Sequence, residues 1–87
     1  MASYEVLIAA SALRESGSVG QKRDRHRILQ SIRELADEPR PHGSTKLAGA
    51  SDAYRIRVGD YRVLYTVDDA VVRVLVIRVG HRRDVYR

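Results

Sequence analysis

The sequence contains no cysteine, which excludes disulfide bonds, thiolate nucleophiles and zinc sites built on cysteine. This absence is typical of proteins from a reducing compartment, and we expect a cytoplasmic location. Long apolar runs are also missing, because Arg73 and Arg78 interrupt the longest one, "AVVRVLVIRVG". That run is far shorter than the roughly 20 residues of a membrane-spanning helix. The N-terminal segment has no basic leader and does not read as a signal peptide, so no membrane partner is expected.

Patterns for metal binding and for several kinds of catalysis are absent as well. The three histidines, His26, His42 and His81, are widely spaced and show no ligand pattern, so we expect no metal and no other cofactor. No glycine-rich phosphate-binding loop precedes a helix, and the serines show no His/Asp arrangement for nucleophilic catalysis. The chemistry must therefore come from other side chains.

The charge is unevenly distributed along the chain. Its 87 residues are few enough that we expect a single domain covering residues 1–87. Of the Lys and Arg residues, eight lie in residues 1–53 with seven acids, and eight lie in residues 54–87 with only four acids. A basic C-terminal part suits a polyanionic partner, either nucleic acid or an acidic protein segment, and is equally compatible with a solvated cationic surface.

Apolar periodicity predicts an α+β fold of order β-α-α-β-β-β, with two N-terminal helices on one face of a four-stranded, mostly antiparallel sheet. Residues 4–9 form the first predicted strand, and Ser11 caps a short helix after it. A second helix from about 20 to 37 carries an apolar stripe. The stripe consists of Ile28, Leu29, Ile32, Leu35 and Ala36. The remaining predicted strands are 54–58, 61–67 and 71–79.

The last of these strands is apolar on both alternating faces, which is typical of a central strand covered on both sides. We expect residues 4–9 to pair with its free side, which leaves residues 54–58 at the edge of the sheet. The segment 39–53, rich in proline, glycine and serine, is predicted to be the one long connection.

The stretch "YRIRVGDYRVLY" predicts a β-hairpin with a type II′ turn at Gly59-Asp60. Such a turn places Val58 opposite Tyr61 and Arg57 opposite Arg62. Apolar and aromatic residues then face the helices, whereas three arginines share the other face. These arginines are Arg55, Arg57 and Arg62. Two arginines directly across from each other repel, so we interpret the cluster as a binding site for a polyanion rather than a stabilising feature.

The C-terminal stretch "VGHRRDVYR" adds other chemical groups. His81 titrates near neutrality and can move a proton. Tyr86 can stack on a base or donate its hydroxyl, and Arg82 and Arg83 add charge. A solvated histidine and a tyrosine that merely clamps the tail are the simpler interpretations of each residue alone.

The segments "KLAG", "YRIRVGDYRVLY" and "VGHRRDVY" together resemble the RelE branch of the RelE/ParE toxin superfamily, over residues 46–87. The resemblance implies a metal-independent endoribonuclease that cuts mRNA on the ribosome and thereby inhibits translation. It also implies a cognate antitoxin, contact with ribosomal RNA, and operator DNA bound only through the antitoxin complex.

The resemblance also assigns roles to individual residues. It implies that Arg62 and Arg82 hold the scissile phosphate and that Tyr86 stacks on a substrate base. Lys46, Arg55, Arg57 and Arg83 are implied as RNA-binding residues. His81 stands where other members carry a basic or titratable residue, and because arginine does not deprotonate, we expect His81 to be the first candidate for proton transfer and Tyr86 the second. 

Two other functions remain open at this point. A ParE-like toxin has the same fold but acts on DNA gyrase, and the joint presence of Arg62, Arg82 and Tyr86 argues against it. A non-catalytic module that only binds RNA or an antitoxin would use the same arginines without cleaving anything.

Overall fold

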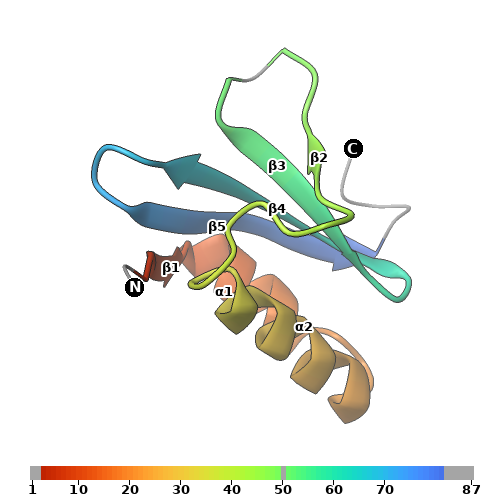
Figure 1. The fold of residues 1–87 in the computed structure, drawn as a ribbon. Coiled ribbons are helices and arrows are strands. Elements are labelled where there is room, and N and C mark those ends of the chain that lie inside the picture. The colour runs from red at the N-terminus through yellow and green to blue at the C-terminus, as the bar shows by residue number, and fades with distance from the viewer. Residues whose placement is uncertain (1–2, 50, 82–87) are drawn as a thin grey trace.

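The computed structural model describes residues 3–49 and 51–81, and it shows two helices covering one face of a five-stranded sheet (Figure 1). The elements follow the predicted order, with one short strand added. Their bounds are β1 Glu5–Ile8, α1 Ala10–Gly17, α2 Lys22–Glu34, β2 Thr45–Lys46, β3 Ala53–Val58, β4 Tyr61–Asp68 and β5 Arg73–His81. Neither described helix is long and apolar enough to cross a membrane.

The strands lie in the order β1-β5-β4-β3-β2. β1 runs parallel to β5, and every other neighbouring pair is antiparallel. β5 is an interior strand paired with β1, as its apolar composition predicts. The sequence places β3 at the edge, but β2 pairs with it at Tyr54 and Arg55, so β3 is covered over part of its length. A two-residue strand has no periodicity, and for this reason the sequence did not reveal it.

The core lies between α2 and the helix-facing side of the sheet. Ile28 and Ile32 of α2 are buried, and so is Leu35, the C-cap residue that follows the helix. They belong to one apolar cluster with buried side chains from the three long strands, namely Ile56, Val58, Val63, Tyr65, Val67, Val74, Val76 and Val79. Leu29 was predicted to join this stripe, but it lies on the outer side of the helix with 37% of its surface exposed.

The outer side of the sheet is not covered in the way that the apolar pattern of β5 predicts. Leu75 and Ile77 are only half-buried, and Leu7 of the neighbouring β1 is 42% exposed. The helices α1 and α2 both lie on the opposite side (Figure 1). The two-sided apolar pattern therefore reflects one true core face and one face that remains open among the described residues.

Most predicted element boundaries differ from the structure by one to three residues, and two of these differences have a local cause. α1 begins at Ala10 with Ala9 as its N-cap, and no side chain caps it, so Ser11 lies inside the helix rather than at its start. β5 begins at Arg73, two positions later than expected. The cause is Val72, whose φ of 56° lies in the left-handed region that β-branched residues rarely adopt, so the chain is still turning there.

A β-bulge divides β5 into two parts. Tyr65 on β4 pairs with Val76, whereas the preceding Leu64 pairs with Arg78, so Ile77 is an extra residue on β5. An extra residue reverses the alternation of side chains beyond it. Val76 and Val79 both face the core for this reason, although they are three positions apart.

The free edge of β5 beyond the bulge is closed by helix α1. Glu15 accepts a hydrogen bond from the backbone N–H of Val79 at 2.9 Å, and it also pairs with the guanidinium of Arg78 at 3.3 Å. Because β1 ends at Ile8, it does not reach Val79, and the carboxylate of Glu15 serves as the hydrogen-bond acceptor there instead.

We expect Glu15→Ala to lower the free energy of unfolding by about 1–3 kcal/mol, because it leaves a half-buried backbone N–H without an acceptor. Glu15→Gln keeps an acceptor oxygen and should lose clearly less. Urea unfolding measures the free energy, and hydrogen exchange at the Val79 amide should accelerate in Glu15→Ala. Unchanged exchange there would show that the carboxylate does not hold this edge.

At the other end of the sheet, Asp69 joins three segments that are distant in sequence. It accepts hydrogen bonds from the hydroxyl of Tyr4 at 2.6 Å and from the guanidinium of Arg40 at 2.8 Å. Arg40 also donates to the hydroxyl of Tyr54 at 2.9 Å. The hydrogen bond from Arg40, followed by the one from Tyr4, lowers the pKa of Asp69. Nearby, burial raises the pKa of Tyr65 to about 12, and its hydroxyl donates to the carbonyl of Pro39 at 2.7 Å.

A carboxyl group with a lowered pKa in the folded state stabilises the fold above its ordinary pKa, and this contribution disappears as the pH falls through the lowered value. We therefore expect acidification below about pH 4 to destabilise the wild type more than Asp69→Asn. Thermal melting of both proteins between neutral and acidic pH measures the difference. Parallel curves for the two proteins would contradict a role for this carboxylate.

Candidate functional site

The β3–β4 hairpin has the predicted turn and register. Gly59 has a φ of 61° whereas Asp60 does not enter the left-handed region, as in a type II′ turn. Val58 pairs with Tyr61, and Arg57 pairs with Arg62. The glycine is required at the first turn position because other residues rarely adopt this φ. The local sequence thus fixes which residues lie opposite each other.

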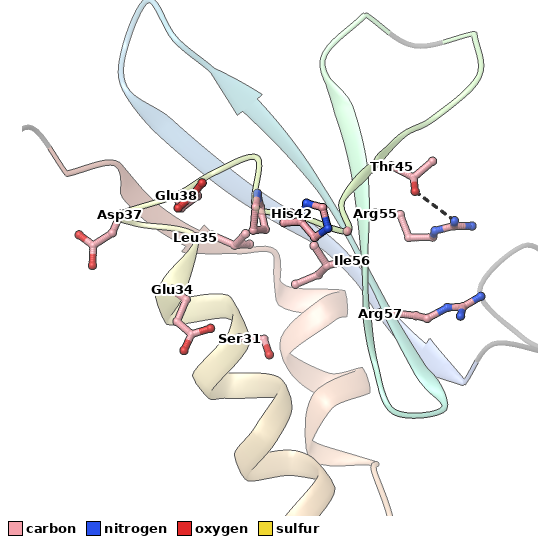
Figure 2. A pocket seen from close by; sticks show the side chains of 12 residues that line it. Ser31, Glu34, Leu35, Asp37, Glu38, His42, Thr45, Arg55, Ile56 and Arg57 are labelled. Carbon is pink, nitrogen blue, oxygen red and sulfur yellow. Dashed lines mark hydrogen bonds between the residues drawn. The ribbon is translucent and has the colours of Figure 1, made fainter.

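The hairpin brings Arg55, Arg57 and Arg62 to the side of the sheet that faces away from the helices, and we call this cluster the arginine face. Figure 2 shows the side chains of Arg55 and Arg57 extending from β3 on the side away from α2. The guanidinium of Arg55 donates to the hydroxyl of Thr45 on β2 at 3.4 Å. The predicted convergence of the three arginines on one face is confirmed by the register.

Arg62 is the central residue of this face, and its hydrogen bonding is incomplete. It lies between Arg57 on β3 and Gly80 on β5. Its Nε and Nη1 atoms are buried and have no hydrogen-bond partner. Buried polar atoms without partners are rare in folded proteins, and a positively charged group is costly to leave in that state. An anion that accepts from these two nitrogens would remove the deficit and also screen Arg57 from Arg62.

Two other predicted site residues lie on the opposite side of the sheet. Lys46 pairs with Tyr54, and His81 pairs with Tyr61, so each shares the helix-facing side with its partner. The ring of His81 contacts that of Tyr61 edge-on, with centroids 5.7 Å apart. We expected His81 to lie beside the arginines. The bulge at Ile77 explains the difference for His81, because regular alternation would have placed it on the arginine face.

The remaining predicted site residues, Arg82, Arg83 and Tyr86, lie outside the described residues. Their roles in phosphate holding, RNA binding and base stacking stay predictions.

Two hollows open on the helix-facing side of the sheet. One of about 350 Å³ is lined by His81, Tyr61 and Arg78 together with Glu15 of α1. The other, an open groove of about 830 Å³, runs between the end of α2 and β3 and has three acidic residues on its wall (Figure 2). These are Glu34, Asp37 and Glu38. Arg55 and Arg57 also line this groove, although their guanidinium groups extend from β3 on the side away from α2, so the groove borders the arginine face (Figure 2).

The sequence did not reveal one neighbour of the site, Arg27 of α2. Its Nη1 atom lies 3.8 Å from the position that a Cβ atom would take at Gly59. The helix pattern predicts that Arg27 is exposed, but the position of α2 relative to the hairpin turn depends on tertiary packing. No sequence signal links these two residues.

The fold and the arginine face define a small α+β toxin of the type that the sequence resembles, and comparisons with known proteins agree. Residues 6–86 match the family described as ParE toxin of type II toxin-antitoxin system, parDE. Toxin RelG of Mycobacterium tuberculosis is 36% identical over 75 residues, which cover 76% of this chain and 86% of RelG.

Solved structures of RelE proteins share the fold. RelE in the archaeal RelE–RelB complex of Pyrococcus horikoshii OT3 matches with a TM-score of 0.82 and 30% identity, covering 94% of this chain and 98% of that one. The isolated E. coli RelE toxin matches with a TM-score of 0.78 and 33% identity, covering 95% of this chain and 90% of the other. The chain therefore belongs to the ParE toxin family of type II toxin–antitoxin systems, and within the RelE/ParE superfamily it is RelE-like.

The unpartnered nitrogens of Arg62 generate a prediction about stability. We expect Arg62→Met to raise the free energy of unfolding by about 1 kcal/mol, because it removes a buried unsatisfied charge and the repulsion from Arg57. Sulfate or phosphate should raise the melting temperature of the wild type more than that of Arg62→Met. Thermal melting with and without each anion tests both statements. A destabilised variant with an unchanged anion response would show that Arg62 is structural.

Proposed function

We propose that this toxin is a metal-independent endoribonuclease that cleaves mRNA and thereby inhibits translation. The observation that carries the proposal is Arg62, with two buried nitrogens lacking a partner, directly across from Arg57 and on the same face as Arg55. Such an arrangement suits a phosphate group, because guanidinium groups are always charged and bind phosphate oxygens in pairs. The RelE relatives support RNA rather than another polyanion as the substrate.

In the proposed reaction, the 2′-hydroxyl of one nucleotide attacks its own 3′-phosphate. A bond forms between the 2′-oxygen and phosphorus, and the bond from phosphorus to the 5′-oxygen of the next nucleotide breaks. The products are a cyclic phosphate and a 5′-hydroxyl. Arg62 and Arg82 neutralise the charge that develops on the phosphate oxygens, Arg55 and Arg57 hold neighbouring phosphates, and Tyr86 stacks on a base.

The reaction also needs a group that takes the proton of the 2′-hydroxyl and one that gives a proton to the leaving oxygen. The arginines cannot do this, since they do not deprotonate in proteins. His81 was the first candidate, but its ring packs against Tyr61 on the far side of the sheet from Arg62. We therefore assign proton transfer to Tyr86 or to groups of the RNA. We expect replacement of His81 to have a smaller effect on the cleavage rate.

A cognate antitoxin is the proposed protein partner. RelE of Pyrococcus horikoshii and RelE of E. coli have both been solved in complexes with an antitoxin. By analogy, an antitoxin binds this toxin and blocks the arginine face, and the pair binds operator DNA through the antitoxin. The ribosome, with the mRNA that it carries, is the proposed place of cleavage, and Lys46 and Arg83 are proposed to contribute to RNA binding.

Inhibition of DNA gyrase is the second candidate function, because the matching family is described as ParE toxin. Purified toxin tested for mRNA cleavage on ribosomes and for inhibition of gyrase supercoiling separates the two. Cleaved mRNA without gyrase inhibition supports the nuclease. RNA binding without any cleaved product would instead indicate a non-catalytic module.

We expect Arg62→Gln to reduce single-turnover mRNA cleavage by about 100-fold or more, since it removes a charged donor to the phosphate. Arg62→Lys keeps the charge but not the paired donors and should retain part of the activity. Arg33→Gln, an exposed arginine in the last turn of α2, is the charge-matched control and should cleave like the wild type.

For His81→Ala we expect the cleavage rate to fall by less than about tenfold and its pH profile to stay unchanged, because the ring packs on the far side of the sheet from Arg62. Loss of a general acid or base would instead cost roughly 10²–10⁴-fold. Single-turnover rates across neutral pH measure this. A loss as large as that of Arg62→Gln, together with an altered pH profile, would show that His81 turns away from Tyr61 and acts in catalysis.

A further inference from the structure

The first half of α2 carries a group of cations that the proposed cleavage site does not use. Lys22, Arg23 and Arg27 are all exposed, and we call them the α2 cation patch. Asp24 is the one acidic residue in this half of the helix. Arg25 is only half-exposed, and it donates to the carbonyl of Val19 at 2.8 Å, which holds the turn between α1 and α2. Arg25 is therefore structural and is left out of the patch.

The patch lies beside the turn from which the arginine face extends. Arg27 approaches Gly59 at the tip of the β3–β4 hairpin. Arg57 lies two residues before Gly59 and Arg62 lies two residues after Asp60. Figure 1 shows the beginning of α2 and the tip of this hairpin at the same end of the molecule. Cationic residues thus lie on both sides of the hairpin tip, which itself carries the exposed acidic residue Asp60.

The patch contains a conflict of the same kind as the arginine face. Arg23 and Arg27 are four residues apart and therefore lie on the same side of α2, where like charges destabilise a helix. Within the described residues, the ion pairs of the protein involve Arg40, Arg73 and Arg78, and none involves Lys22, Arg23 or Arg27. Cationic clusters on both sides of one turn indicate a long polyanion that contacts both.

We infer that the α2 cation patch binds the backbone of the same RNA whose scissile phosphate lies on the arginine face. The RNA strand passes around the hairpin tip, and Arg23 and Arg27 contact phosphates several nucleotides from the cleavage position. This inference rests on the proposed function for the identity of the polyanion. The patch positions and holds RNA, and it takes no part in bond breaking.

Single-stranded RNA fits this surface better than an acidic protein segment. Between Arg23 and Arg27 the helix carries no apolar residue, and on the arginine face the Nε and Nη1 atoms of Arg62 are buried without a partner among the described residues. A regular row of phosphates can follow the path around the hairpin tip, whereas a protein segment usually adds apolar anchors to an interface. An acidic protein partner is nevertheless one of the outcomes that the experiment below distinguishes.

The test compares Arg23→Gln/Arg27→Gln with the control Arg14→Gln/Arg33→Gln, which removes the same charge from exposed arginines at the C-terminal ends of α1 and α2. Both variants and the wild type are titrated with RNA that carries a 2′-deoxy nucleotide at the cleavage position and so cannot be cut. Two lengths are used, about 4 and about 16 nucleotides, which span the site sizes of small single-strand-binding domains. Each titration is repeated over a range of salt concentrations.

For the longer RNA, the plot of log affinity against log salt should be less steep for the patch variant than for the wild type, by about 1.4 in slope, because two phosphate contacts disappear. For the shorter RNA, wild type and patch variant should bind alike. The control should match the wild type with both lengths. Equal slopes for all three proteins with the longer RNA would overturn the inference.

Two further measurements distinguish a failure of the nuclease proposal from a failure of the inference about the α2 cation patch. Arg62→Gln should weaken binding of both RNA lengths. If it does so while the wild type leaves cleavable mRNA intact, the nuclease proposal fails and the RNA patch stands. If instead the patch variant binds both RNAs normally but no longer binds the purified cognate antitoxin, the surface is a protein-docking site and the inference is wrong. Melting temperatures of all variants confirm that they are folded.

Discussion

The Gly59-Asp60 reversal is the constraint on which the site depends, because it sets Arg57 directly against Arg62. A slip of one residue would send the arginines into the core and the valines into solvent, so the register is held by the burial of Ile56, Val58 and Val63. The apolar side of the hairpin thus supplies the energy that holds three like charges together on the other side. Core packing and the proposed binding face thus occupy opposite sides of the same two strands.

The second constraint is the bulge in β5. By adding one residue at Ile77, it turns Val79 into the core and turns Arg78 out of it, where Glu15 can reach it. The same shift carries His81 to the side of Tyr61. The groups that the sequence places together around one phosphate are therefore divided between two faces. The arginine face holds fixed charge without a histidine beside it, which is consistent with a site that orients RNA and stabilises charge more than it moves protons.

Much of the fold follows from local patterns, whereas the side-chain distribution at the site follows only in part. The hairpin register was predictable because turn chemistry and alternation agree over residues 54–67. The stripe on α2 was predictable apart from Leu29, since a period alone does not define how wide a face the sheet covers. The strand at Thr45 and Lys46 is too short to show a period, and the bulge at Ile77 lies in a run of β-branched residues where every register looks equally apolar. The approach of Arg27 to Gly59 depends on how the helix layer sits on the sheet.

The parallel pairing of β1 with β5 has a consequence for folding. Glu5 and Arg73, which form an ion pair at 3.0 Å, are 68 positions apart in the chain. The strand that joins the two parts of the sheet is also the last of the described strands to be synthesised, and closing such a long loop is slow relative to forming the hairpin or the helices. Forming the β1–β5 pair therefore closes a far longer loop than forming the β3–β4 hairpin, whose strands are joined by the two-residue Gly59-Asp60 turn.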